Sequence, residues 1–249
     1  MKKYNLFALS AMMIAFVLCT TSCSLEDQEI VSQKDAARSF TIQPEKPDTV
    51  YTGVDDKPGT ADLSQEWWKF VLGHDCNNNP LNYPNLQETE YQGGAVVFLV
   101  GSKNGVASRY IVARSNQTFF VPIFNTLQFE KCIRPALKPA IDESVENSLI
   151  EEADHFIDLV TNLKVVLDDN NIRITDDHRR ASGVFTITAE KELSGCLDYC
   201  ITGDEQKVAS DGYWLTLKNL TPGWHELHTH GEILHTGLIE DVYYYILIQ

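Results

Sequence analysis

The chain has few basic residues for its length, and this shortage limits the partners it can have. Its 249 residues include 20 Lys and Arg against 35 Asp and Glu, a formal net charge of −15 at pH 7. A protein this acidic repels the phosphates of nucleic acids and of an anionic membrane surface. We therefore expect no nucleic-acid partner. Disorder is excluded as well, because a chain that is 43% hydrophobic can bury a substantial core.

The sequence also lacks the motifs that mark common catalytic sites. It contains no G-x-S-x-G nucleophile elbow, no zincin motif and no P-loop. The run from Asp168 to Asn171 lacks the spacing, the glycine and the terminal glutamate of an EF-hand. Glycosidase acids cannot be chosen among 35 carboxylates without geometry. We predict no catalytic residue and no cofactor, and these absences favour a protein that is not an enzyme.

The apolar run at residues 6–18 is too short to cross a membrane as a helix, which needs roughly 20 residues. It follows Lys2 and Lys3, and a basic start before a short apolar run is typical of a signal peptide. We predict a signal peptide over residues 1–22.

The four residues that end at Cys23, Thr-Thr-Ser-Cys, resemble a bacterial lipobox, although Thr20 stands where leucine is usual. We predict that Cys23 is cleaved, acylated and anchored in a membrane. Cys19 is the weaker candidate, because bulky Leu18 precedes it where a small residue is wanted. The alternative is ordinary secretory cleavage without a lipid.

The acidic residues after Cys23 are similar to the surface-export signals of Bacteroidetes lipoproteins. Residues 23–62 are polar, with prolines at 44, 47 and 58, which indicates a flexible tether. We predict an outer-membrane protein that is lipid-anchored and exposed at the cell surface. In the simpler alternative, the acidic residues only keep the tether solvated.

Residues 63–249 are predicted to form one domain, a mainly antiparallel β-sandwich of two sheets. Short apolar or alternating runs bounded by turn residues favour strands at 95–100, 108–113, 118–125, 163–167, 183–188 and 242–248. A turn at 101–105 is expected to pair the first two of these strands. The clearest prediction is a hairpin over residues 211–231, with alternating strands on either side of Pro222 and Gly223.

Two helices are expected beside the strands. A short one begins near Leu63, with Ser64 as its N-cap. The second is amphipathic, and its apolar residues recur at intervals of three and four from Pro139 onward: Ile141, Val145, Leu149, Ala153, Phe156 and Val160. Because its other face is acidic, we expect this helix to pack on a sheet rather than on a membrane.

The predicted ligand site is the loop at residues 75–92, which is long, polar and rich in asparagine. Tyr83 and Tyr91 lie in it, and Trp68 precedes it. Tyrosine combines an apolar ring with a polar tip, which suits a glycan or a peptide. The alternative is that the loop only covers one end of the sandwich, and for Trp67 and Trp68 core packing is the favoured role.

The four cysteines of the domain, Cys76, Cys132, Cys196 and Cys200, form an even set in an exported protein, which favours disulfides. Three pairings are open, and we favour Cys196 with Cys200 and Cys76 with Cys132. Zinc binding and buried free thiols are the alternatives.

His228 and His230 lie two apart on a predicted strand, so they share a face on which a divalent ion would suit them. No third ligand is identified, so they remain weak candidates and no metal site is predicted. His225 lies on the opposite face and is expected to bond backbone at the turn.

Several segments occur in an order that resembles a widespread family of uncharacterised bacterial exported proteins. The resemblance covers about residues 67–248, through a Q-x-G-x-V-x-F-L-x-G stretch from Gln92 and a later D-G-Y-W-L, L-x-P-G-x-H and D-V-x-Y pattern. The aspartate, glycine and cysteine of the family loop are missing from residues 82–90. The resemblance implies export and fold, and no catalytic residue.

These observations favour a noncatalytic, lipid-anchored binding or accessory module at the cell surface, attached to a nutrient-uptake or adhesion assembly. Its partners would be the membrane, reached through the lipid, an outer-membrane protein complex, and a glycan or peptide. A secreted hydrolase acting on glycans or peptides is the first alternative. A structural envelope protein is the second.

Overall fold

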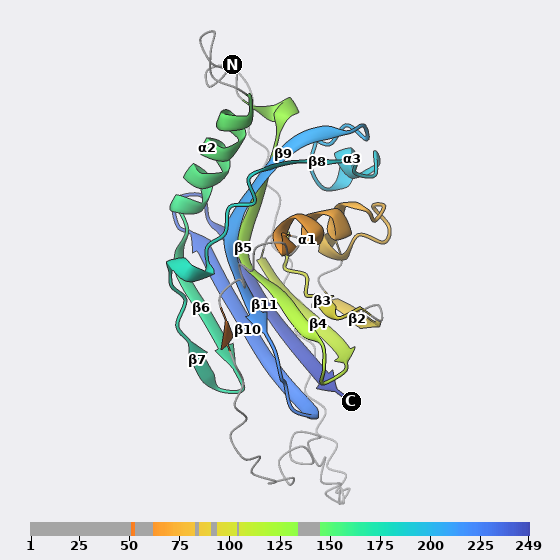
Figure 1. Cartoon of the computed structure of the whole chain (residues 1–249), viewed down its shortest axis with the longest axis vertical. Coiled ribbons are helices and arrows are strands. Elements are labelled where there is room, and N and C mark those ends of the chain that lie inside the picture. Colours follow the sequence, from red (N-terminus) through yellow and green to blue (C-terminus); the bar gives the residue numbers. More distant parts are fainter. Residues whose placement is uncertain (1–50, 53–61, 83–84, 91–93, 104, 134–144) are drawn as a thin grey trace, which may run out of the picture. The chain divides into compact units, whose positions relative to one another are not determined.

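The strands are arranged in two sheets that pack face to face, as predicted (Figure 1). The computed structural model describes residues 51–52, 62–82, 85–90, 94–103, 105–133 and 145–249. All of these belong to one compact unit, Lys46–Gln249. Among them, no helix is long and apolar enough to cross a membrane.

Sheet A has the order β1-β9-β5-β3, with β8 also paired to β9. Its members are β1 (Tyr51–Thr52), β3 (Val96–Phe98), β5 (Thr118–Phe129), β8 (Val184–Ile187) and β9 (Gln206–Leu217). Sheet B has the order β2-β4-β11-β10-β6-β7. Its members are β2 (Asn85–Glu90), β4 (Gly105–Ala113), β6 (Thr161–Leu167), β7 (Asn170–Ile172), β10 (Gly223–Ile233) and β11 (Leu238–Ile248).

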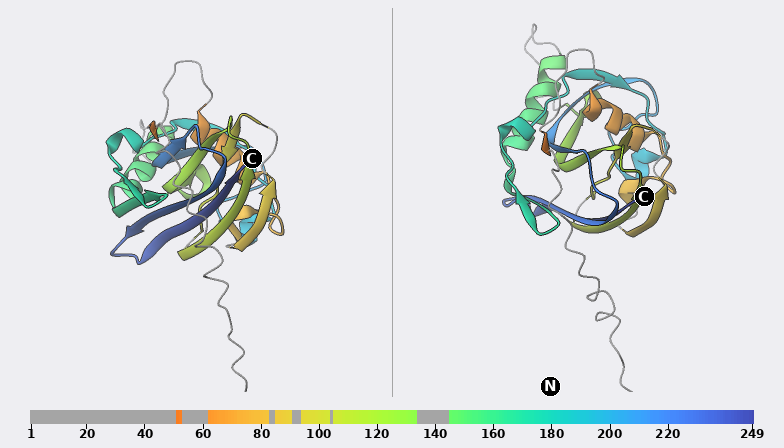
Figure 2. Two further views of the ribbon diagram at one scale, coloured as in Figure 1. Left: turned by 90° about the horizontal axis from the view of Figure 1, so that it is seen from below. Right: turned by 60° about the horizontal axis from the view of Figure 1, so that its bottom comes forward.

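Most described strand pairs are antiparallel, which confirms the prediction for the fold. The exceptions are β4 with β2 and β11, and β3 with β5, which are parallel. Figure 2 shows the long strands β10 and β11 side by side, with β4 next to them. The core between the sheets is built from inward residues of β4, β5, β9 and β11, among them Ile111, Val121, Ile123, Leu215, Leu217, Val242 and Ile246.

The predicted hairpin at residues 211–231 is wrong. Both of its strands exist, but β9 pairs with β5 in sheet A, and β10 pairs with β11 and β6 in sheet B. Both faces of β9 are buried, since Trp214 and Thr216, which alternate with Leu215 and Leu217, are 0% and 1% exposed. Alternation shows that successive side chains face opposite ways, but it does not show which strand is the partner. The chain between β9 and β10 therefore crosses from one sheet to the other.

The same error applies to the turn expected at 101–105, because β3 and β4 belong to different sheets. Strands β6 and β7 do pair with each other, across a turn at Asp168 and Asp169. Asp168 and Asp169 take the left-handed conformation, with φ of 49° and 65°, as a tight two-residue hairpin turn requires.

Helix α1 (Leu63–Leu72) covers the face of sheet A that points away from sheet B. Trp67 and Trp68 are both buried there, and Trp67 meets Trp214 of β9 edge-on at 5.4 Å between ring centroids. The N-cap is Asp62 rather than the predicted Ser64, because Asp62 Oδ1 accepts a hydrogen bond from Ser64 N at 3.0 Å. Burial of two indole side chains, roughly 2–3 kcal/mol each, holds the helix on the sheet.

Helix α2 (Val145–Asp158) packs on the opposite face of sheet A, beside sheet B. Leu149, Ala153 and Ile157 are its buried apolar residues, and Leu149 reaches Ala209 of β9. The predicted packing of an amphipathic helix on a sheet is thus confirmed. Arg179, just after the 3-10 turn η3 (Asp176–His178), ties this region together through Asp154, Asp158 and buried Asp211.

All four domain cysteines form disulfides, but the favoured pairing is wrong. The bonds are Cys76–Cys196 and Cys132–Cys200, and they close loops with sequence separations of 120 and 68 residues. Cys196 ends helix α3 (Leu193–Cys196) beside the loop that follows α1, whereas Cys200 lies beside the 3-10 turn η2 (Glu130–Cys132). Closeness in sequence misled the prediction, because these two cysteines face different elements.

Several predictions concern residues outside the described part of the chain. They are the signal peptide at 1–22, lipidation at Cys23, Tyr83, Tyr91 and most of the tether at 23–62. Within the tether range, Tyr51 and Thr52 form β1 and pair with Leu217 and Thr216 of β9.

Candidate functional site

A partly open cavity of about 230 Å³ lies between α1, the second half of β5 and the loop after α3. The residues that line it come from segments far apart in the sequence: Trp67, Trp68, Leu72, Leu81, Gly101, Ser102, Lys103, Asn125, Thr126, Leu127, Phe129, Leu197, Asp198, Ile201 and Glu240. Eight of them are apolar or aromatic, six are polar or charged, and one is glycine. A small-molecule site is usually lined in this way.

The two tryptophans of α1 form part of the wall. Trp67 Nε1 donates a hydrogen bond to Leu99 O at 2.6 Å, and Trp68 Nε1 donates one to Ser210 Oγ at 2.7 Å. Since both N–H groups already have protein partners, a ligand can meet these side chains only through their carbon and π surfaces. The rings stand at 88° to each other, so the pair is edge-on rather than a flat platform.

Glu240 is the most unusual group at the cavity. Its side chain points inward from β11, and the residue is 9% exposed. Among the described residues, none makes a hydrogen bond or ion pair with its carboxyl group. Burial raises the pKa of Glu240 well above its usual value. An unpaired carboxyl in a buried position is costly, which makes it a strong candidate for a functional group.

Asn125 contributes a second polar group without a partner. Its Nδ2 atom is buried, and no described residue accepts a hydrogen bond from it. The residue sits opposite Gly212 of β9, where a Cβ would lie 2.5 Å from Asn125 Cβ. Only glycine at position 212 leaves room for Asn125, so the sequence holds this amide in place.

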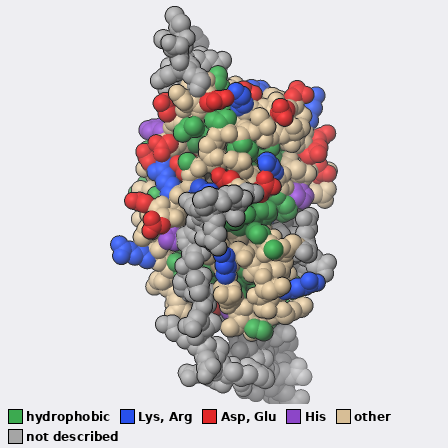
Figure 3. Space-filling model, in the orientation of Figure 1, with side chains coloured by type: hydrophobic (Ala, Val, Ile, Leu, Met, Phe, Trp, Pro, Cys, Tyr) green, Lys and Arg blue, Asp and Glu red, His purple; other side chains and the backbone are tan. Residues whose placement is uncertain are grey.

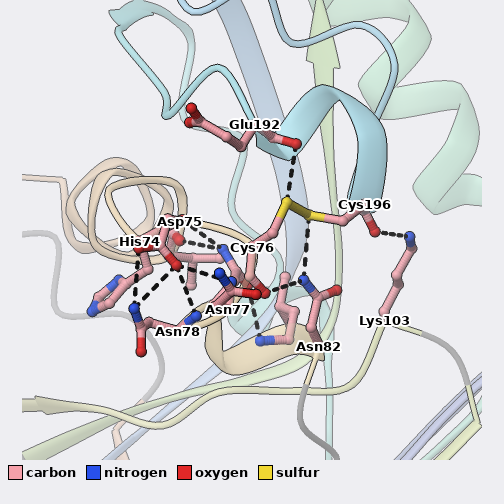
Figure 4. The surroundings of a disulfide bond; sticks show 12 residues. His74, Asp75, Cys76, Asn77, Asn78, Asn82, Lys103, Glu192 and Cys196 are labelled. Atoms are coloured by element: carbon pink, nitrogen blue, oxygen red, sulfur yellow. Dashed lines mark hydrogen bonds between the residues drawn. A yellow bond between two sulfur atoms is a disulfide. The ribbon is translucent and has the colours of Figure 1, made fainter.

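The remaining charged residues of the lining are held by protein contacts. Lys103 Nζ donates to Cys196 O at 2.8 Å, beside the Cys76–Cys196 disulfide (Figure 4). Asp198 Oδ1 accepts a hydrogen bond from Cys200 N at 2.8 Å. The two disulfides thus fix the loop that carries Leu197 and Asp198 on one side of the cavity. Glu240 is the charged residue there that has no such bond among the described residues.

The loop predicted to bind a ligand is only partly a loop. Residues 85–90 form β2, which pairs with β4 at one edge of sheet B. The asparagines before it stabilise the chain itself, since Asn79 Nδ2 donates to Val71 O. Figure 4 shows Asn82, whose Nδ2 donates to Cys76 O. Leu81 of this loop lines the cavity, as does Trp68, although Trp68 is only 8% exposed. Nothing in the described residues tests the predicted roles of Tyr83 and Tyr91.

His228 and His230 share one face of β10, as predicted, and both approach Asp241 of β11. His228 Nε2 lies 2.5 Å from Asp241 Oδ1, and His230 Nδ1 lies 3.7 Å from Oδ2. His228 also stacks on Tyr243 at 4.2 Å between ring centroids. Among the described residues, no group of three or more His, Cys, Asp or Glu is placed to hold a metal. These contacts account for the two histidines as part of the outer face of sheet B.

Asp168, His225 and Thr221 are arranged like an acid, an imidazole and a hydroxyl of a hydrolase. His225 Nδ1 lies 2.6 Å from Asp168 Oδ2, but Nε2 is nearer to the Thr221 carbonyl oxygen, at 2.8 Å, than to the hydroxyl, at 3.4 Å. Both ring nitrogens therefore donate to oxygens. The hydrogen bond with Asp168 raises the pKa of His225, which favours a cation rather than a general base. The expected backbone bond of His225 at the turn is confirmed.

Charged side chains of both signs are mixed on the face drawn in Figure 3. Acidic side chains are spread over much of the face in Figure 3, with Lys and Arg side chains among them rather than in one patch. A single basic stripe of the kind that binds nucleic acid is not seen on that face.

Sequence reasoning missed Glu240 and Asn125. A signal for Glu240 existed, because it is in phase with the inward residues Val242, Tyr244 and Ile246 of the same strand. Inward positions of a strand are normally apolar, so a charged residue in this phase is an exception that the sequence itself reveals. For Asn125 no comparable signal exists, since the irregular pairing between Pro122 and Phe124 shifts the register of β5 just before it.

Comparison of the chain with protein-family models, with curated proteins and with solved structures finds no match.

Proposed function

We propose that this protein is a noncatalytic binding module that is anchored by lipid at Cys23 in the outer membrane and displayed at the cell surface. In this proposal the cavity beside α1 holds a small ligand, or the end of a glycan or peptide. The module would serve a nutrient-uptake or adhesion assembly in the outer membrane.

The observation that carries this proposal is that the largely buried carboxyl of Glu240 and the buried Nδ2 of Asn125, which has no partner among the described residues, line one cavity with an aromatic wall. Buried polar groups without partners reduce stability, typically by about 1–3 kcal/mol each. Such groups do not help to stabilise the fold, whereas a ligand can supply the hydrogen bonds that they lack. The surrounding wall is held by two disulfides and a packed helix, so the site is formed before the ligand arrives.

A test is to screen the domain against glycan, peptide and small-molecule collections by thermal shift, and then to fill the cavity. Leu81→Trp adds bulk at a lining position, and Leu234→Trp makes the same change in an exposed turn, where the leucine is 66% exposed. Binding that is lost in Leu81→Trp and kept in Leu234→Trp would place the ligand in the cavity. Equal binding by both variants would refute that location, and a wild type that binds nothing would favour the structural envelope protein.

A hydrolase is the second candidate, because Asp198 and Glu240 line the same cavity. Glycosidases use one carboxylic acid with a raised pKa and a second, ionised carboxylate. Turnover of glycoside or peptide substrates that disappears in both Asp198→Asn and Glu240→Gln would support this candidate. Binding without turnover would support the module.

A further inference from the structure

The chemistry of the cavity can be taken one step further than its role as a binding site. Glu240 offers oxygen acceptors and, when ionised, a negative charge, while Asn125 Nδ2 offers a hydrogen-bond donor. A ligand that satisfies both groups needs a donor or a positive charge at one point and an oxygen acceptor at another.

The surroundings of the Glu240 carboxyl group do little to stabilise a negative charge on it. A Cβ on Gly101 would lie 3.1 Å from Glu240 Oε2, so the carboxyl group lies against the Gly101 backbone. This contact supplies no hydrogen-bond donor to the carboxyl group. Because the residue is 9% exposed, solvation by bulk water is also small. The carboxylate form is therefore poorly compensated within the described part of the chain.

The other lining groups favour a cation over an anion. Lys103 is already bonded to Cys196 O, and the two acids Asp198 and Glu240 outweigh its charge. Trp67 is buried and Trp68 is 8% exposed, so Trp68 is the tryptophan with some surface left for a ligand, and an indole ring attracts ammonium groups held over its face. The strongly negative net charge of the whole chain also raises the local concentration of cations.

We propose that the cavity binds a ligand that carries both a protonated amine and an oxygen acceptor, with Glu240 as the counter-ion of the amine and Asn125 as donor to the oxygen. Amino sugars and amino alcohols have this chemistry. This inference rests on the proposed function, since it names the class of ligand for the same site.

Binding of such a ligand involves a proton balance. Burial raises the pKa of Glu240, so below that pKa the free protein holds a proton on the carboxyl group. To pair with an ammonium group, the carboxyl group must release this proton to solvent. Affinity should therefore rise up to tenfold for each pH unit as the pH approaches the Glu240 pKa, and level off above it, as long as the amine stays protonated.

The experiment is isothermal titration with two amines, glucosamine and ethanolamine, and with their neutral counterparts, glucose and ethylene glycol. We expect the amines to bind at least about tenfold more tightly than the counterparts, and the binding heat to differ between buffers of different ionisation enthalpy, because a proton is released. Glu240→Gln should lose that preference for amines. Glu205→Gln is the matched control, since Glu205 is exposed and outside the cavity lining.

Each other result overturns a specific statement. If the amines and the neutral compounds bind equally, and Glu240→Gln keeps both, the cavity holds neutral polyols; the proposed function then stands and this inference falls. If neither amine binds while a neutral glycan or peptide is captured, the inference falls in the same way. If nothing binds at all, both fall. The proton release is measured on the wild type, so it tests the inference even if Glu240→Gln does not fold.

Discussion

Replacement of Glu240 by glutamine should change the pH dependence of stability in a defined way. In the unfolded chain a glutamate ionises near pH 4.3. In the folded protein burial raises the pKa of Glu240 well above its usual value. Between these two pKa values the folded state holds one more proton than the unfolded chain. The free energy of unfolding therefore decreases as the pH rises through this window.

The magnitude follows from the number of protons. One extra proton in the folded state gives a slope of up to about 1.4 kcal/mol per pH unit. The loss is absent below the unfolded pKa and complete above the folded pKa. Glu240→Gln cannot ionise, so the difference in unfolding free energy between variant and wild type should grow through the window. A change in packing adds an offset that does not depend on pH.

Urea denaturation at a series of pH values measures this difference, with fluorescence of the buried tryptophans as the signal and the disulfides intact. The control is Glu205→Gln, which makes the same substitution at an exposed position and should run parallel to the wild type. If the curve of Glu240→Gln is also parallel to the wild type above the unfolded pKa, Glu240 ionises like an ordinary surface glutamate. The description of the cavity would then be wrong.

Three further predictions concern the frame around the site. Peptide mapping without reduction should find Cys76 linked to Cys196 and Cys132 linked to Cys200, and a linked Cys196–Cys200 peptide would contradict the structure. Removal of the Cys132–Cys200 bond should lower the free energy of unfolding by about 4 kcal/mol. In urea denaturation, Asp211→Asn should lower the free energy of unfolding by about 2–3 kcal/mol, because it weakens the charged hydrogen bonds of a buried carboxylate to Arg179. Asp154→Asn changes a mostly exposed partner of the same arginine and should lower it by less than about 1 kcal/mol, so equal effects would contradict this difference in burial. Cys23→Ala should release the protein from the membrane fraction and abolish acyl labelling, and membrane retention without any lipid on the wild type would contradict the predicted anchor.

Local patterns predicted the elements better than their partners. The period of three and four in residues 145–158 identified α2 and its buried face, because helical periodicity is a property of one segment. The alternation around Trp214 identified β9, but alternation within one strand carries no information about its partner, which is β5. Pairing between sheets and between cysteines is set by contacts far apart in sequence, and it was mispredicted in both cases.

The candidate site was harder to predict, for the same reason. Trp68 and Leu81 belong to segments that we singled out, and both line the cavity. Glu240 and Asn125 come from strands in different sheets, and only the packing of β5 against β10 and β11 brings them to one place. The asparagines at 77–82 suggested binding, but those with assigned partners bond the loop to itself and to α1.

The most direct test of the cavity is the ionisation state of Glu240 with and without an amine. Carbon-13 NMR of glutamate side-chain carboxyls reports this state, and the Glu240 signal is the one missing from the spectrum of Glu240→Gln. At a pH below its raised pKa, we predict a protonated signal in the free protein that moves to the ionised position when glucosamine is added and stays unchanged with glucose. An ionised signal in the free protein at that pH, or a signal that does not respond to glucosamine at saturating concentrations, would contradict the account.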